Sequence, residues 1–250
     1  MSILEVKNLT IQFGGLRAVD DFNLSLEKGE LVAVIGPNGA GKTTIFNMLT
    51  GIYRPTAGSI ELEGESLVGL KPYQFAQRGI TRTFQNIRLF ANASVADNVK
   101  MAATMHGKDN QASCLLRTRK MVEHERELDE KVMSLLERLN MADKADLLAK
   151  NLPYGDQRRL EIARALMTDP KILLLDEPVA GMITTELEEM AQLVAQIRKD
   201  FNLSIIMIEH HMNFVMPIAD RIKVVDFGKT ISEGTPDVVQ KDPKVIEAYL

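Results

Sequence analysis

The feature that most constrains the fold is a glycine-rich segment that joins a short apolar run to a helix-like stretch. Residues 36–43 read Gly-Pro-Asn-Gly-Ala-Gly-Lys-Thr and fit the pattern G-x-x-x-x-G-K-[ST]. The apolar run Leu31–Ile35 precedes this segment, and the stretch Thr43–Leu49 follows it. A buried strand that turns through glycines into a helix is the setting in which this pattern forms a phosphate-binding loop, so we expect an α/β fold.

The chemistry of phosphate binding explains these residue types. Glycines let the backbone wrap closely around an anion, and the amide groups at the start of the following helix point toward it. In this pattern the Lys42 side chain reaches the β and γ phosphates of ATP, and the Thr43 hydroxyl binds Mg²⁺. The residues that we assign to the nucleotide site from this loop are Gly36, Pro37, Asn38, Gly39, Ala40, Gly41, Lys42, Thr43 and Thr44.

Two further apolar runs extend the α/β pattern. Ile172–Leu175 and Ile205–Ile208 are short and continuous, which is typical of strands buried on both faces of a mainly parallel sheet. Helix-like stretches follow these runs, at Thr185–Ile197 and His211–Ile218. Thr185 and Glu188 stand at capping-box spacing, so we expect the first of these helices to begin at Thr185.

Two other regions depart from this alternation. In residues 1–65, short segments interrupted by glycines predict a small antiparallel sheet, formed by Leu4–Thr10, Asn23–Leu26 and Ser59–Leu62. The region Ser94–Asn151 is predicted to be helical. One amphipathic helix is expected there, with an apolar stripe of Leu128, Val132, Leu135, Leu136 and Leu139.

Composition and charge narrow the class of protein. The chain has 250 residues and is 45% hydrophobic, which is enough apolar material for a core. Its net charge of -4 lacks the basic excess typical of nucleic-acid binding, so no nucleic-acid partner is expected. Its single cysteine, Cys114, favours a reducing compartment. The N-terminus does not resemble a signal peptide and no apolar run reaches the roughly 20 residues needed to span a bilayer, so a membrane role is expected only through a partner.

Two carboxylates follow the second apolar run. Asp176 and Glu177 stand directly after Ile172–Leu175. In a P-loop protein, the first carboxylate of such a pair holds Mg²⁺, and the second is placed to polarise the attacking water as a general base. The sequence therefore predicts that Asp176 binds the metal through water and that Glu177, together with Lys42, is catalytic.

A segment just before that run narrows the class further. Residues 152–166 read Leu-Pro-Tyr-Gly-Asp-Gln-Arg-Arg-Leu-Glu-Ile-Ala-Arg-Ala-Leu, which resembles the LSGGQ signature loop and following helix of ATP-binding cassette (ABC) proteins. Gly155 matches the second glycine of that loop. Pro153, Tyr154 and Asp156 depart from it, at positions where the family has Ser, Gly and Gln. The resemblance implies that Gly155 contacts a nucleotide across a dimer.

Three more residues match family positions in the expected order. Phe13 resembles the aromatic residue that stacks on adenine, although an aromatic side chain here could also belong to a core. Gln85 resembles the Q-loop glutamine, which senses Mg²⁺ and the transmembrane partner. His210 resembles the catalytic switch histidine that contacts the γ phosphate, and His211 beside it stands where the family often has Asp.

Four segments point to one branch of the family. They resemble the ATP-binding proteins of high-affinity branched-chain amino acid transporters, and they lie at residues 13–16, 83–90, 154–161 and 245–250. These segments mark the branch and do not contact the transported molecule. One further departure is Ile183, which stands where the family has Asp or Asn in a polar contact across the dimer.

The resemblance implies an architecture and a working assembly. It implies one ABC nucleotide-binding domain over residues 1–250, with an ATPase core and β subdomain at 1–93 and 166–250 and a helical subdomain at 94–165. It further implies a peripheral subunit at the cytoplasmic face of the membrane. The implied partners are integral permease subunits, a second ATP-binding subunit and, indirectly, a substrate-binding protein.

Three alternatives remain open from the sequence alone. The first is the ATPase of another transport system, such as lipopolysaccharide export, which shares the closing Tyr-Leu. The second is a soluble ABC protein that acts on ribosomes or DNA. Such proteins usually carry two ATPase domains or a long coiled coil, and this chain shows neither. The third is a general P-loop enzyme such as a nucleotide kinase, which the signature helix disfavours.

Overall fold

The chain divides into two compact units. The computed structural model describes residues 2–103 and 119–249, so Cys114 lies outside the described residues. One unit comprises Met1–Gln85 with Lys171–Leu250, and the other comprises Asn86–Pro170. Among the residues described, no helix is both long and apolar enough to cross a membrane.

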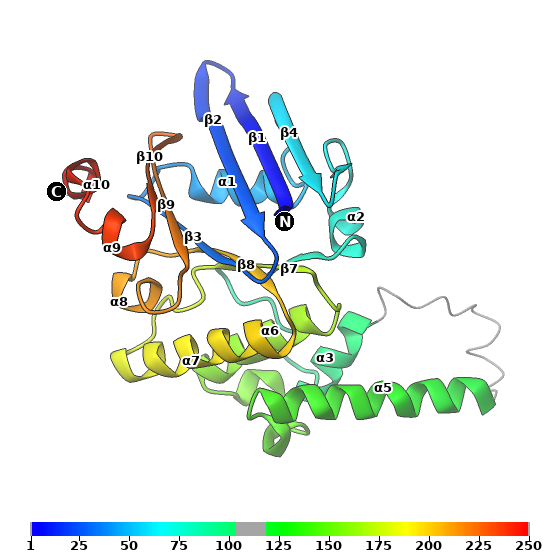
Figure 1. The fold of residues 1–250 in the computed structure, drawn as a ribbon. Coiled ribbons are helices and arrows are strands. Elements are labelled where there is room, and N and C mark those ends of the chain that lie inside the picture. The colour runs from blue at the N-terminus through cyan, green and yellow to red at the C-terminus, as the bar shows by residue number, and fades with distance from the viewer. Residues whose placement is uncertain (1, 104–118, 250) are drawn as a thin grey trace. The chain divides into compact units, whose positions relative to one another are not determined.

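The first unit is built on a mainly parallel sheet (Figure 1). Its strands are β3 (Leu31–Ile35), β6 (Ile80–Arg82), β7 (Ile172–Asp176), β8 (Ser204–Ile208), β9 (Arg221–Asp226) and β10 (Lys229–Gly234). Within the described residues their order is β10-β9-β3-β8-β7-β6, and only β10 runs antiparallel to its neighbour. Every residue of β3, β7 and β8 is buried, which confirms the strands predicted from the three apolar runs.

A smaller antiparallel sheet completes the strands of this unit. It consists of β1 (Ser2–Phe13), β2 (Leu16–Glu27), β4 (Ala57–Leu62) and β5 (Glu65–Ser66), in the order β2-β1-β4-β5. One apolar core joins it to the parallel sheet, since Phe22 of β2 belongs to the same buried cluster as Phe46 and Ile206. The predicted antiparallel sheet is therefore confirmed, with longer strands than its separate segments indicated.

The helices of the first unit follow the predicted alternation with the strands. They are α1 (Lys42–Leu49), α2 (Pro72–Gln77), α7 (Thr184–Asp200), α8 (Met212–Val215), α9 (Pro236–Val239) and α10 (Pro243–Tyr249). The expected helix His211–Ile218 is too long, because α8 ends at Val215. Pro217 has no amide proton to donate to the preceding turn, which explains the early end.

The predicted start of α7 is also wrong by one residue. The helix begins at Thr184, and the residue before it, Ile183, is the N-cap. The amide of Ile183 donates to Oε2 of Glu186 at 3.0 Å, so the carboxylate that ties down the first turn is Glu186. The expected pairing of Thr185 with Glu188 therefore does not define this boundary.

The second unit is helical. It contains α3 (Val95–Ala103), α5 (Arg119–Arg138), two 3₁₀ turns (Ala142–Lys144 and Ala149–Asn151) and α6 (Tyr154–Leu166). Ser94 caps α3, because its Oγ accepts from the amide of Asp97 at 3.0 Å. α3 contacts both α5 and α6. Four residues of the predicted apolar stripe are buried on α5 and just beyond it, namely Val132, Leu135, Leu136 and Leu139, whereas the fifth, Leu128, is half-buried.

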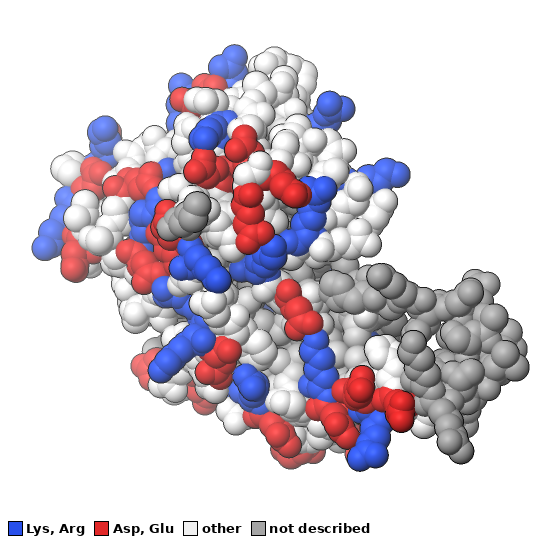
Figure 2. All heavy atoms as spheres, turned by 45° about the vertical axis from the view of Figure 1, so that its right-hand side comes forward, with Lys and Arg blue, Asp and Glu red and all other residues white. Residues whose placement is uncertain are grey.

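Exposed charges of this unit pair with one another. On the face drawn in Figure 2, acidic and basic side chains are interspersed. Lys100 Nζ lies 2.6 Å from Asp129 Oδ1, and Arg126 Nε lies 3.0 Å from Glu130 Oε1. Such exposed pairs contribute roughly 0–1 kcal/mol each, so the buried stripe stabilises the unit more than they do.

Candidate nucleotide-binding site

The glycine-rich loop lies between β3 and α1, where close backbone contacts leave no room for larger residues. A Cβ at Gly36 would lie 2.0 Å from the carbonyl oxygen of Val225, and one at Gly41 would lie 2.8 Å from that of Ala18. Gly41 also has a φ of 101°, a left-handed conformation that favours glycine. No described side chain caps the first turn of α1, so the backbone amides of that turn can donate hydrogen bonds to a bound anion. The loop therefore fits the phosphate groups of a nucleotide.

Lys42 is the first residue of α1 and its side chain is buried. Its Nζ donates to the carbonyl oxygens of Gly36 and Pro37, at 2.6 and 2.9 Å. Burial lowers the pKa of the Lys42 ammonium from its ordinary value, and nearby carboxylates, that of Glu177 foremost, oppose the shift. The ammonium is thus held against the loop by weak neutral acceptors, which a phosphate oxygen outcompetes.

Glu177 directly follows β7, and two predicted site residues lie close to its carboxylate. Its φ of 46° is uncommon for a residue other than glycine, and its amide donates to the carbonyl oxygen of Ile208 at 3.0 Å. Oε2 of Glu177 accepts from Nε2 of Gln85 at 2.8 Å, and Oε1 lies 3.9 Å from Nδ1 of His210. A conformation that costs about 1–3 kcal/mol is found mainly where a site requires it.

Asp176 ends β7 as a buried carboxylate. Its side chain is 5% exposed, and its Oδ2 accepts from Nη2 of Arg82 at 2.6 Å. The backbone amide of Asp176 donates to Oγ1 of Thr83 at 3.4 Å. The sequence did not indicate this arginine, although it stands three residues before Gln85. A carboxylate that is buried and fixed in orientation is suited to hold a metal-bound water.

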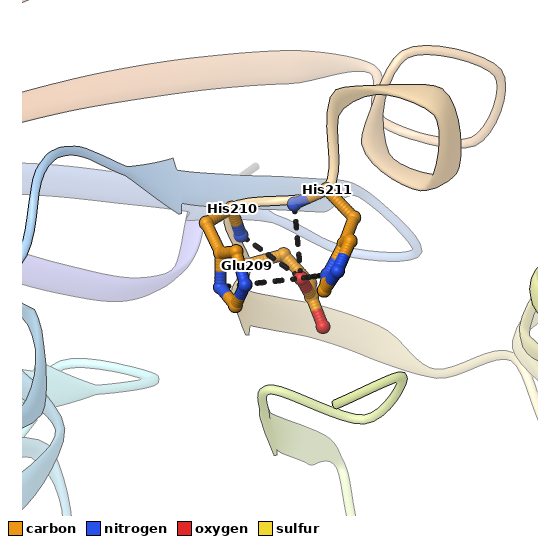
Figure 3. A group of neighbouring side chains, drawn as sticks. All are labelled: Glu209, His210 and His211. Carbon is orange, nitrogen blue, oxygen red and sulfur yellow. Dashed lines mark hydrogen bonds and ion pairs between the residues drawn. The ribbon is translucent and has the colours of Figure 1, made fainter. Parts of the chain in front are cut away.

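Glu209 anchors the segment that carries His210 (Figure 3). Its side chain is fully buried, and its Oε2 accepts from the amides of His210 and His211 at 2.9 and 3.1 Å. The same oxygen lies 2.9 Å from Nδ1 of His211, and Oε1 accepts from the amide of Val179 at 3.2 Å.

The three side chains have the donor types of a metal site but a different role in the structure. The reactive atoms of Glu209, His210 and His211 lie within 4.8 Å of one another. Both oxygens of Glu209 are already committed to the three amides and the imidazole nitrogen, and a carboxylate has few further lone pairs to offer. We therefore interpret the cluster as a hydrogen-bond network that positions the two histidines, whose rings lie 4.1 Å apart.

Phe13 lies at the end of β1 and contacts Tyr53. The two ring centroids are 5.3 Å apart with an interplanar angle of 72°, an edge-to-face arrangement that aromatic pairs favour. Phe13 is 45% exposed, so the alternative that it is a core aromatic is wrong. An exposed ring fixed at its edge has a face available for stacking on a base.

In the helical unit, the residues that depart from the family signature make contacts of their own. Pro153 is the N-cap of α6. The hydroxyl of Tyr154 accepts from Nη2 of Arg158 at 3.2 Å, and Oδ2 of Asp156 accepts from Nζ of Lys144 at 2.7 Å. Tyr154 and Asp156 thus each make a polar contact within their own unit.

Two further predicted positions, Ile183 and Thr43, are both exposed. Ile183 is 66% exposed, so its apolar side chain is presented to solvent at the N-terminus of α7. The hydroxyl-bearing residue Thr43 is also exposed, next to buried Lys42. The structure thus brings Gln85 and His210 to Glu177, and it adds Arg82 and Glu209, which the motifs did not identify.

A parallel sheet in which β3 runs into a phosphate loop and β7 ends in paired carboxylates defines the class of protein: a P-loop nucleotide-binding protein. The family model for ABC transporters matches residues 19–180. A second model, described as branched-chain amino acid ATP-binding cassette transporter, matches residues 229–250.

Known proteins resemble the chain over nearly its whole length. The high-affinity branched-chain amino acid transport ATP-binding protein BraF of Pseudomonas aeruginosa is 46% identical over 99% of this chain and 97% of its own. LivG of Escherichia coli K12, which has the same descriptive name, gives the same values. A solved structure of a nucleotide-free ATP-binding cassette from an ABC transporter superposes with a TM-score of 0.86 at 29% identity, covering 100% of this chain and 99% of the other. One in the ADP conformation gives a TM-score of 0.87 at 30% identity, with coverage of 100% and 98%.

These similarities identify the family to which the chain belongs within the P-loop nucleotide-binding proteins. It belongs to the ABC transporter family, as an ATP-binding cassette related to BraF and LivG. The predicted fold class is confirmed by the two superpositions, including the antiparallel β subdomain and the inserted helical part.

Proposed function

We propose that this chain is the ATP-hydrolysing subunit of an ABC transporter that imports branched-chain amino acids. The observation that carries the hydrolytic part is the Glu177 carboxylate, which follows Asp176 and lies between Gln85 and His210. The cargo is inferred from BraF and LivG, whose names state branched-chain amino acid transport and which match the chain almost from end to end.

In this proposal each site residue of the first unit has a defined role. Lys42 and the loop amides bind the phosphates, and Phe13 stacks on adenine. Thr43, Gln85 and Asp176 would hold Mg²⁺, with Asp176 acting through water, and the ion would supply positive charge against the phosphate oxygens.

The remaining residues act on the attacking water and across the dimer. Glu177 accepts a proton from the water as general base, which suits its position beside the buried Asp176. His210 orients toward the γ phosphate, supported by Glu209. Gly155 is offered to the nucleotide of a second subunit, because its amide is kept although Pro153 before it offers none.

The assembly that we propose has two ATP-binding subunits on integral permease subunits, at the cytoplasmic face of the membrane. The described part of the chain has no membrane-spanning helix, so attachment is assigned to the permeases. Closure of the two ATP-binding subunits on ATP and their release after hydrolysis drive the permeases.

The test is transport in proteoliposomes that contain the chain with its co-purified membrane partners. We expect ATP-dependent uptake of radiolabelled leucine, and no uptake when Glu177→Gln replaces the wild-type chain. If the proteoliposomes hydrolyse ATP but do not take up leucine, isoleucine or valine, the assignment as an ATPase stands and the assignment of the transported amino acids is wrong. Co-purification with a lipopolysaccharide exporter would favour the other transport system.

A further inference from the structure

Arg82 is the cation that pairs with Asp176. It ends β6, in register with Leu174 of β7, which places its side chain near the end of that strand. Nη2 of Arg82 donates to Oδ2 of Asp176 at 2.6 Å, and both side chains are 5% exposed. Because an isolated buried ion is strongly disfavoured, the pairing of the two groups offsets the cost of burying each charge.

Further contacts fix the guanidinium where it is. Nη1 of Arg82 donates to Oδ1 of Asn47, on α1, at 2.8 Å. Its Cζ lies 5.4 Å from the ring centroid of Phe46 and 5.3 Å from that of Phe84. Arg82 is thus held by the helix that follows the phosphate loop, by the end of β7 and by the segment that leads to Gln85. It cannot leave Asp176 without losing several of these contacts.

We propose that Arg82 is the resident counter-cation of Asp176 and lowers the affinity of this carboxylate for free Mg²⁺. The inference rests on the proposed function, in which Asp176 holds Mg²⁺ through water. A fixed positive charge beside the carboxylate repels a second cation at short range, and the repulsion is weakly screened at a buried site. The phosphates of a nucleotide supply the negative charge that offsets this repulsion, so Mg²⁺ joins the site together with the nucleotide and not before it.

Substitutions at Arg82 can separate the effect of its charge from the effect of its geometry. Arg82→Met and Arg82→Gln both remove the charge, whereas Arg82→Lys keeps it but cannot reach Asp176 and Asn47 with a planar fork. If the charge suppresses metal binding, the two neutral variants behave alike and the lysine variant resembles the wild type.

The experiment measures binding of Mn²⁺, a paramagnetic substitute for Mg²⁺, to the full chain without nucleotide by electron paramagnetic resonance. We expect weak binding to the wild type and to Arg82→Lys. Arg82→Met and Arg82→Gln are expected to bind Mn²⁺ about tenfold more tightly or better, from the loss of one nearby charge. The double variant Arg82→Met/Asp176→Asn is the matched control, and it should lose the gain because the carboxylate is gone.

Stability provides a second readout if Arg82→Met does not fold. Arg82→Gln keeps one amide donor group on a polar side chain, and the double variant carries no uncompensated buried charge. We expect Mg²⁺ alone to raise the melting temperature of Arg82→Gln but not that of the wild type or of the double variant.

Two results would overturn the proposal. Unchanged Mn²⁺ affinity in the neutral variants would show that the charge of Arg82 does not oppose the metal. An equal gain in Arg82→Lys would show that the geometry of the side chain, and not its charge, controls metal binding.

A separate experiment measures binding of a fluorescent ATP analogue to the wild type with Mg²⁺ and with EDTA. Absence of binding there would contradict the proposed function itself, so the two failures are distinguishable.

Discussion

Gln85 donates from its Nε2 to Oε2 of Glu177 at 2.8 Å, although the two residues are 92 positions apart in the chain. The sheet explains this contact. Gln85 stands three residues after β6, Glu177 directly after β7 and His210 two residues after β8. These three strands are adjacent and parallel. Since the carboxyl ends of parallel strands meet at one edge, residues from three distant segments converge on one carboxylate.

The first prediction concerns Glu177. Glu177→Gln keeps the size of the side chain and removes the base, so we expect retained ATP binding with hydrolysis slowed about 100-fold or more. The variant should also prolong the ATP-bound dimer, which size-exclusion chromatography with ATP can measure. Glu188→Gln, an exposed change on α7, is the matched control. Hydrolysis by Glu177→Gln at half the control rate or above would exclude Glu177 as the base.

The second prediction concerns Lys42. Its Nζ contacts only loop carbonyls among the hydrogen bonds described, so Lys42→Ala should leave the fold intact while removing the charge that attracts phosphate. We expect ATP hydrolysis to fall below about 1% of wild type, a loss of roughly 3 kcal/mol in transition-state stabilisation. Circular dichroism and the melting temperature check the fold, and Lys28→Ala serves as an exposed control. Normal turnover in a folded Lys42→Ala protein contradicts the phosphate-loop assignment.

The third prediction concerns Glu209, which the motifs did not identify. Glu209→Gln replaces one acceptor oxygen by an amide group that faces backbone donors, so the free energy of unfolding should fall by about 1–3 kcal/mol. Because two of those donors are the amides of His210 and His211, hydrolysis should also slow. Urea unfolding measures the first effect, with exposed Glu247→Gln as the control. Equal stability of the two variants would show that the network around Glu209 contributes nothing.

The sequence predicted the fold where apolar residues run without interruption. β3, β7 and β8 were found because all of their residues face a core. β9 was missed because Arg221 and Lys223 interrupt its apolar pattern. Lys223 is buried all the same, since its charge is paired with Glu233 on β10, a partner that no local pattern reveals. Strand β6, with three residues, is too short for any periodicity to be read.

The site could be predicted where a residue belongs to a local motif. Lys42, Asp176 and Glu177 each stand beside a recognisable strand or loop, so local sequence is enough to identify them. Arg82 is buried and paired with Asp176 on the neighbouring strand, and Glu209 is buried and accepts from the amides of Val179, His210 and His211. Burial of this kind depends on the whole fold and cannot be read from a local motif. The one local indication for Glu209 was its position directly after β8, the same indication that identified Glu177 after β7.

The basis of the last prediction is that the departures from the family pattern are unevenly placed. The first unit keeps all the residues assigned to the phosphates and the metal, whereas Pro153 and Ile183 depart at positions that the family presents across the dimer. Pro153 has neither a hydroxyl nor an amide proton to offer a phosphate, while Gly155 keeps its amide. We therefore expect the signature that this chain offers to a partner to be weakened but not abolished.

We predict that the two ATP sites are unequal when the partner is a different subunit with a regular signature. The site on this chain's phosphate loop meets the regular signature and hydrolyses faster. The site on the partner's loop meets Pro153 and is slower by about 1–2 kcal/mol in barrier, roughly five- to thirtyfold in rate, which is the scale of one or two lost phosphate hydrogen bonds. In the assembled transporter, Lys42→Ala should therefore remove more ATPase activity than the matching lysine change in the partner. Pro153→Ser should narrow the difference by restoring a hydroxyl and an amide to the slower site. Equal losses from the two lysine changes, with no gain from Pro153→Ser, would show that the sites are equivalent, and a homodimeric assembly would remove the basis for any asymmetry.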